Sequence, residues 1–185
     1  KGFLQNINFQ YSLRGENRIQ TTDSLFFTKE MFDSAKSGFQ HNIPISTNFK
    51  LFKYLSFSTS ANYNATMVFN TIERSFDIEN QEVVTIDNKG YDGFSTYNFS
   101  ASLGTTVYGM YDFKNKKNLQ AIRHVLRPSI SYSLAPAFNQ YYDTYEVVSA
   151  DGLTTSDLEY SRFEGSIFGQ PNKFYSSSIG LSLAN

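Results

Sequence analysis

The chain contains no cysteine and no tryptophan, and only 4 prolines in 185 residues. Disulfides, thiolate metal sites and cysteine nucleophiles are therefore excluded. Charged residues make up 18% of the chain, which is low for a soluble domain, and no apolar run is long enough to cross a membrane as a helix. The net charge of -1 provides no concentrated basic surface, so the sequence predicts no nucleic-acid partner. Aromatic residues, in contrast, reach 17%.

Several stretches of the chain alternate strictly between apolar and polar residues. The clearest runs from Leu55 to Phe69, where apolar residues hold most odd positions and Ser, Asn and Thr hold the even ones. Successive side chains of a strand point to opposite faces, so this stretch has one apolar face and one small, neutral-polar face. The wet face of a soluble sheet usually carries many Lys and Glu. The pattern therefore predicts strands that face lipid on one side and a crowded, wet barrel interior on the other.

The same alternation predicts six strands, each long enough to cross a bilayer with roughly 9 to 11 tilted residues. Single-chain bacterial barrels begin at about eight strands, and an open sheet would leave unpaired backbone groups in hydrocarbon. We therefore expect an all-β fold: an antiparallel, up-and-down transmembrane β-barrel in which residues 1–185 form a single partial domain, about six strands of a larger barrel. The predicted strands are Gly2–Leu13, Phe39–Phe49, Leu55–Phe69, Phe94–Tyr111, Val125–Ala135 and Phe174–Ala184.

The phase of each strand assigns its side chains to one face or the other. The residues predicted to face lipid are Phe57, Ala61, Tyr63, Phe99, Leu103, Ile130, Tyr132, Ile179 and Leu181. The residues predicted to face the lumen are Ser58, Ser60, Asn62, Asn98, Ser100, Ser102, Ser131 and Ser178.

The segments between the strands differ in length and in charge. The long segments Asn70–Gly93 and Pro136–Lys173 each carry six acidic and two basic residues, whereas Asp112–Arg127 carries one acidic and five basic residues. Outer-membrane barrels have short periplasmic turns and longer extracellular loops. The long acidic segments are therefore predicted to be extracellular loops, and the basic segment a periplasmic turn.

Aromatic residues gather near the predicted strand ends. Phe49 and Tyr54 flank the shortest connection, and Phe69 and Phe94 flank the long acidic segment between two strands. Such positions are typical of the aromatic girdles at the two membrane interfaces. Core packing of a soluble β-sandwich is the alternative interpretation.

Two motifs resemble the barrel of the Bacteroidota-type lipopolysaccharide-assembly outer-membrane protein, LptD. Residues 120–138 read QAIRHVLRPSISYSLAPAF after YGMY at 108–111, and residues 160–169 read YSRFEGSIFG before a Ser-rich strand. The resemblance implies a location in the cell outer membrane and a role in moving lipopolysaccharide or lipooligosaccharide to the cell surface. It also implies partners, namely an LptE-like plug lipoprotein and periplasmic bridge proteins. In that family the saccharide passes through the lumen while the lipid leaves sideways through a seam between the first and last strands.

The sequence offers little catalytic chemistry. The only histidines are His41, on an apolar strand face, and His124, in the basic segment, and neither has the spacing of a nucleophile-activating triad. The acidic residues Asp77, Glu79 and Glu82 lack a calcium-loop pattern and are interpreted as a solvated loop. We therefore expect no enzyme activity and no catalytic, cofactor or metal site.

Two prolines lie inside predicted strands. Pro44 and Pro128 lack the backbone N–H that a ladder needs, so we expect a bulge or an interfacial strand end at each, with a weakened seam as the alternative.

Other functions stay open at this point. A porin or plugged nutrient receptor would share the strand pattern, and a secreted β-sandwich adhesin would be soluble without detergent. A barrel esterase would require His41 or His124.

Overall fold

A computed structural model describes residues 6–112, 121–149 and 152–185. The start of the first predicted strand and most of the basic segment lie outside these ranges. The described elements are β1 (Ile7–Phe9), β2 (Ser12–Arg18), the 3-10 turn η2 (Asp23–Leu25), α1 (Lys29–Asp33), β3 (Lys36–Leu51), β4 (Leu55–Asp77), β5 (Glu82–Gly104), β6 (Val107–Asp112), β7 (Ala121–Ala135), the 3-10 turn η3 (Asn139–Tyr141), β8 (Tyr142–Val148), β9 (Thr155–Ser161) and β10 (Ser176–Ala184).

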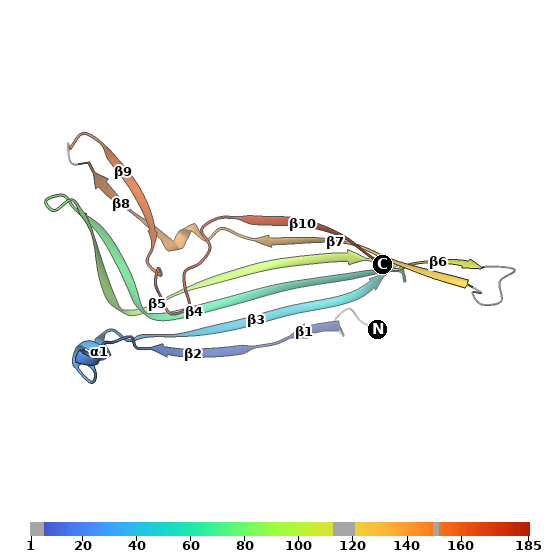
Figure 1. The fold of residues 1–185 in the computed structure, drawn as a ribbon, viewed down its shortest axis with the longest axis horizontal. Coiled ribbons are helices and arrows are strands. Elements are labelled where there is room, and N and C mark those ends of the chain that lie inside the picture. Colours follow the sequence, from blue (N-terminus) through green and yellow to red (C-terminus); the bar gives the residue numbers. More distant parts are fainter. Residues whose placement is uncertain (1–5, 113–120, 150–151) are drawn as a thin grey trace.

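The main sheet is an antiparallel meander in which strands that follow one another in the chain also pair. Its order is β1-β3-β4-β5-β7-β10, with β2 also on β3 and β6 also on β7, while β8 and β9 form a separate hairpin (Figure 1). The predicted all-β, antiparallel, up-and-down fold is confirmed. Over the described residues the sheet does not close on itself, so β10 and the β1–β2 edge each have one unpaired side, which fits part of a larger barrel. No helix among these residues is long and apolar enough to span a membrane.

Pro44 explains why the first predicted strand is divided into β1 and β2. The register is the same on both sides of the break, since Phe9 lies opposite Ile45 and Ser12 lies opposite Asn42. At the break the N–H of Gln10 donates to the carbonyl of Pro44 at 3.1 Å, but proline has no N–H to return the second bond of the pair. The two pieces are therefore one strand with a missing ladder bond.

Pro128 divides β5 from β6 in the same way. Gly104 lies opposite Ser129 and Val107 lies opposite Leu126, which again is one continuous register. Between them the N–H of Thr105 donates to the carbonyl of Pro128 at 3.1 Å with no return bond. Counting each interrupted strand once, the sheet has the six strands that the alternation predicted, and neither proline shifts the register.

Two of the predicted loops are largely strand. The interpretation of Asn70–Gly93 as a loop is wrong, because β4 and β5 continue as a paired hairpin to a turn at 78–81. The segment Pro136–Lys173 contains the β8–β9 hairpin, which was also not predicted. Charged residues are compatible with a strand wherever its faces meet water, so charge alone does not mark the end of a strand.

The β4–β5 hairpin bends away from the long axis of the sheet (Figure 1). The bend follows a register shift between Val68 and Asn70, as expected of a β-bulge. At the tip, the Asp77 carboxylate accepts hydrogen bonds from the N–H groups of Glu79 and Asn80 at 2.9 and 3.1 Å. Hydrogen bonds from the side chain and backbone of Asn80 hold the pKa of Asp77 below its usual range. We call the end of the sheet that carries this hairpin, α1 and the β8–β9 hairpin the hairpin end.

Among residues 6–112, 121–149 and 152–185, one cluster of buried apolar side chains forms a compact core, and it lies at the hairpin end. Val68 and Phe94 from β4 and β5 pack there against Phe163 and Ile167, with Tyr141 and Phe168 beside them. Most large apolar side chains elsewhere on the sheet are exposed. A sheet of this length is thus stabilised mainly by its backbone ladder and by partners on its faces.

Replacing Pro128 with Ala supplies the missing donor. The new N–H is expected to donate to the carbonyl of Thr105 and to join β5 to β6, with a stabilisation of about 0.5–1.5 kcal/mol. Hydrogen exchange of the refolded protein in detergent would show a slowly exchanging amide at residue 128. Pro171→Ala, outside the sheet, is the control and should leave the β5–β6 amides unchanged. Exchange at the solvent rate at residue 128 would contradict this account of the break.

Candidate functional site

All eight residues predicted to face the lumen lie on one face of the main sheet. The register places Ser58 opposite Ser102, and Ser102 opposite Ser131 on the next strand. Ser60, Ser100, Ser133 and Ser178 form a second row that crosses four strands. Asn62 and Asn98 are opposite each other in a third row. We call this surface the polar face; whether it faces a lumen remains a prediction.

Hydroxyl groups on the polar face bond to one another across the strands. The hydroxyls of Ser60 and Ser100 lie 2.7 Å apart, and those of Ser133 and Ser178 lie 2.6 Å apart. The rows near the centre of the sheet contain no charged side chain. The polar face therefore presents neutral hydroxyl and amide groups, which can exchange hydrogen bonds with water or with another hydroxyl-rich molecule.

The nine residues predicted to face lipid share the opposite face, which we call the apolar face. Their register alternates with that of the polar residues throughout, for example Phe57 opposite Leu103 and Leu103 opposite Ile130. This face is open: Ile179 and Leu181 are 71% and 80% exposed. The register groups Phe57, Ala61, Tyr63, Phe99, Leu103, Ile130, Tyr132, Ile179 and Leu181 together. That lipid covers them is not tested by the register.

One segment lies across the polar face at the hairpin end. Residues 161–169, which begin at the last residue of β9 and which we call the strap, pass over β3, β4 and β5 (Figure 1). Val68 pairs with Gly38, and Phe94 pairs with Thr66, so all four belong to the polar face. Phe163 is fully buried between the strap and the sheet. The prediction that Phe94 belongs to an interfacial girdle is therefore wrong, because its ring packs 4.7 Å from that of Phe163.

Polar contacts tie the strap to each strand beneath it. Arg162 binds Asp92 of β5 at 2.7 Å, and Arg74 of β4 binds Glu164 at 3.0 Å. The ammonium of Lys36, at the start of β3, donates to the carbonyl of Gly165 at 2.7 Å. The backbone joins as well, since the N–H of Ile72 donates to the carbonyl of Arg162 at 2.9 Å. These contacts place the strap at one position along the sheet.

The buried ring contributes more to holding the strap than any single ion pair. Burying a Phe side chain contributes about 1.5–3 kcal/mol. Arg162 and Asp92 retain 30% and 36% exposure, and an ion pair that exposed contributes only about 0–1 kcal/mol. Phe163 therefore contributes most of the free energy that holds the strap on the sheet. The ion pairs determine where along the strands the strap lies.

Glycines allow the strap to turn and to approach the sheet. Gly165 and Gly169 have φ of 69° and 77°, the left-handed region that a side chain disfavours. On the sheet, a Cβ at Gly38 would lie 3.1 Å from both Ile167 and Phe168. The close contact between strap and β3 thus depends on a missing side chain.

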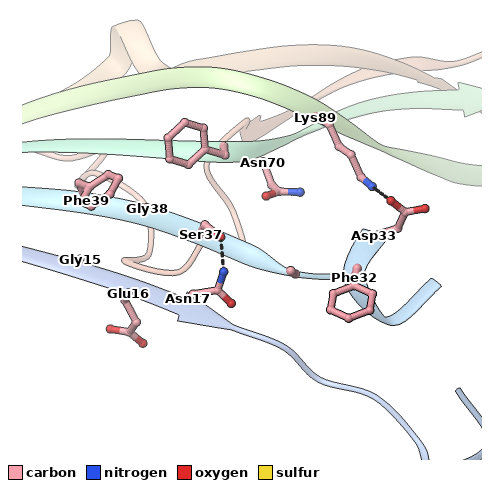
Figure 2. A pocket seen from close by; sticks show the side chains of 12 residues that line it. Gly15, Glu16, Asn17, Phe32, Asp33, Ser37, Gly38, Phe39, Asn70 and Lys89 are labelled. Carbon is pink, nitrogen blue, oxygen red and sulfur yellow. Dashed lines mark hydrogen bonds and ion pairs between the residues drawn. The ribbon is translucent and has the colours of Figure 1, made fainter. Parts of the chain in front are cut away.

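A pocket of about 710 Å³ lies at the same end but on the apolar face, between β2, β3 and α1. Figure 2 shows Phe39 on one side and the ion pair of Lys89 with Asp33, 2.8 Å long, on the other. That hydrogen bond from Lys89 holds the pKa of Asp33 below its usual range. Asn17 likewise donates to Ser37 at 2.8 Å. The polar groups of this pocket bind one another and the pocket is widely open, so its geometry identifies no ligand.

The two histidines lie far apart in the sheet. His41 of β3 is 2.8 Å from the hydroxyl of Tyr11, and His124 of β7 lies opposite Gly109. β4 and β5 separate the two strands. Among residues 6–112, 121–149 and 152–185, no three His, Cys, Asp or Glu side chains gather as metal ligands.

In the β8–β9 hairpin, burial raises the pKa of Tyr142, and the charge of Glu164 raises it further. The hydroxyl of Tyr142 donates to the carbonyl of Pro171.

Comparison with known families decides the assignment. The family described as LptD protein matches residues 1–185, the whole chain. The chain belongs to the LptD family. No curated protein and no solved structure matches it. Membership in the LptD family supports a role in lipopolysaccharide transport or assembly at the outer membrane, and this family is one of transport proteins rather than enzymes.

The strap is one part of this LptD-family chain that the alternation did not reveal. Only the family resemblance pointed to residues 160–169, and the long acidic segment that contains them was predicted to be an extracellular loop. The available signal was composition: Phe163, Ile167 and Phe168 are unusual in a loop that is solvated on all sides. Two glycines at turning positions accompany them.

Replacing Phe163 with Ala should detach the strap. The substitution removes the one fully buried ring and leaves ion pairs that are individually weak, so the segment should become extended and mobile. Limited trypsin digestion, read by mass spectrometry, is expected to cut after Arg162 at least ten-fold faster in the variant. Phe174→Ala, whose ring is 75% exposed, is the control and should cut at the unchanged rate. Equal rates in both variants would show that Phe163 does not hold the strap.

Proposed function

We propose that this chain forms six consecutive strands of an outer-membrane β-barrel and that its polar face lines the lumen through which the saccharide part of lipopolysaccharide or lipooligosaccharide reaches the cell surface. The observation that carries the proposal is the division of one continuous sheet into an open apolar face and a hydroxyl face whose central rows carry no charge. Lipid solvates the first and water or saccharide solvates the second.

The open edges of the sheet support a larger barrel. Each unpaired backbone group in hydrocarbon costs several kcal/mol, so β10 and the β1–β2 edge require further strands within a membrane. The two long hairpins and α1 lie at one end of the sheet, and the three-residue turn between Leu51 and Leu55 lies at the other (Figure 1). Long connections on one side are typical of the extracellular end. The hairpin end is accordingly placed outside the cell and the short turn in the periplasm.

The proposed partners follow from the LptD family. A plug lipoprotein of the LptE type would occupy the lumen of the complete barrel, and periplasmic bridge proteins would deliver the glycolipid. The neutral hydroxyl rows suit a saccharide in transit, because they exchange hydrogen bonds without a fixed charge that would retain it. The chain itself performs no chemistry on the glycolipid in this proposal.

Two other functions are less well supported. A porin or plugged nutrient receptor would use the same strand pattern, but the match over the whole chain is to the LptD family. A secreted β-sandwich adhesin would cover its apolar face with a second sheet. The only other sheet among the described residues has two strands, β8 and β9, and it leads into the strap, which lies on the polar face.

Neighbouring residues on β5 offer a matched test of the two faces. Phe99→Lys places a charge on the apolar face, which at the centre of a bilayer costs about 2–4 kcal/mol. Ser100→Lys places the same charge one position further along, on the polar face. We expect the amount of folded, protease-resistant protein in the outer membrane to fall several-fold for Phe99→Lys and to stay near wild type for Ser100→Lys. An equal loss of folded protein in both variants, or a larger loss in Ser100→Lys, would contradict the assignment of the apolar face to lipid and the polar face to the lumen.

The transport role is tested by depleting the full-length protein. Cell fractionation should recover it in the outer membrane, and surface protease should cut at the tip of the β4–β5 hairpin in intact cells. Depletion should reduce surface glycolipid and cause it to accumulate on the inner side of the envelope. Unchanged surface glycolipid after depletion, with the protein gone, would exclude the conduit.

A further inference from the structure

We infer that the strap, residues 161–169, closes the outer end of the polar face and must release from the sheet for a saccharide to pass. The inference rests on the proposed conduit, because only there does the polar face line a passage. The strap is then a part that moves while the strands of the main sheet stay paired.

The position of the strap obstructs the path along the sheet. It lies on the polar face over β3, β4 and β5, at the hairpin end of strands whose central part carries the neutral rows. Val68 and Thr66, beneath and beside it, are each 1% exposed, whereas Ser58 on the same face and strand is exposed. A molecule that moves along the strands, from the neutral rows toward the hairpin end, therefore meets the strap.

The attachment is specific enough to define a closed state. Three strands each provide a separate tie to the strap: Lys36 to Gly165, Arg74 to Glu164 and Asp92 to Arg162. Asp143 of β8 lies 3.7 Å from Arg162 and connects the strap to the β8–β9 hairpin. Gly38 provides the space that lets Ile167 and Phe168 reach the sheet. A loop that merely lay in solvent would need none of these contacts.

The same attachment is limited enough to be released. The ion pairs are 27% to 50% exposed and can exchange with water. Phe163 is the one fully buried ring of the strap, and only a single backbone bond, from Ile72, joins the strap to β4 among the described residues. Gly165 and Gly169 supply turning points inside it. The strap can therefore leave without breaking any pairing of the main sheet.

A reversible cross-link tests the release. One backbone hydrogen bond of 2.9 Å joins the N–H of Ile72 to the carbonyl of Arg162, and residues that exchange such bonds in a strand pair have Cα atoms about 5.5 Å apart, a separation that a disulfide spans. The chain has no cysteine, so the double variant Ile72→Cys/Arg162→Cys introduces one defined pair. It is made in the full-length protein with any other cysteines replaced. Arg162→Cys alone is the matched control, because it loses the same arginine and cannot form the link.

The readout is surface glycolipid in cells under oxidising and reducing conditions, with the cross-link followed by gel mobility. We expect the cross-linked variant to export at least five-fold less, reductant to restore its export to the level of Arg162→Cys, and Arg162→Cys to export equally in both conditions. A cross-link that forms with export unchanged overturns the inference and leaves the conduit intact. Failure of the cross-link to form overturns the position of the strap. An equal loss in Arg162→Cys that reductant does not relieve overturns the release step, since the arginine rather than movement is then required.

Accessibility of Val68 gives an independent measurement that does not depend on export. In Val68→Cys, a membrane-impermeant maleimide should react at least ten-fold more slowly than in Ser58→Cys, which lies on the same face and strand outside the strap. Adding Phe163→Ala should remove most of the difference. Fast reaction of Val68→Cys with the strap intact would overturn the closed state. The proposed conduit function is tested separately: it is contradicted if depletion of the protein leaves surface glycolipid unchanged.

Discussion

The structure depends on one constraint, the pairing of each strand with its neighbours in one register through the central part of the sheet. Because side chains alternate, that register places the serines of the central rows on one face and the large apolar residues that alternate with them on the other. A slip of one residue in any strand would exchange the two faces of that strand. The two-faced surface is thus a property of the ladder as much as of the composition.

The ladder tolerates two interruptions without losing this property. Pro44 and Pro128 each remove one donor, yet the pairs on either side keep the same register. The bulge between Val68 and Asn70 differs, because it changes the register, and the hairpin bends beyond it. Prolines therefore weaken a strand pair locally, whereas the bulge changes the direction of the strands and lies where the hairpin end begins.

Alternation predicted the strands and their faces from the sequence because both follow from local geometry, the period of two along an extended chain. Near the hairpin end the same signal failed, since Glu73, Arg74 and Glu82 were read as loop although the neighbouring Val83 and Val84 favour a strand. The strap was missed for another reason. Phe163 meets Val68 and Phe94 across 95 and 69 positions of the chain, and no periodic pattern records a contact of that range.

The docking surface of the strap also has a consequence for assembly. Gly38, Val68 and Phe94 come from three different strands and share one face only when β3, β4 and β5 have paired in the native register. Before that pairing the surface does not exist, and after a one-residue slip of β4 Val68 would point to the opposite side. Docking of Phe163 is therefore a late step of folding that stabilises only the correctly paired sheet. The strap in this way favours the native register of the strands that it covers.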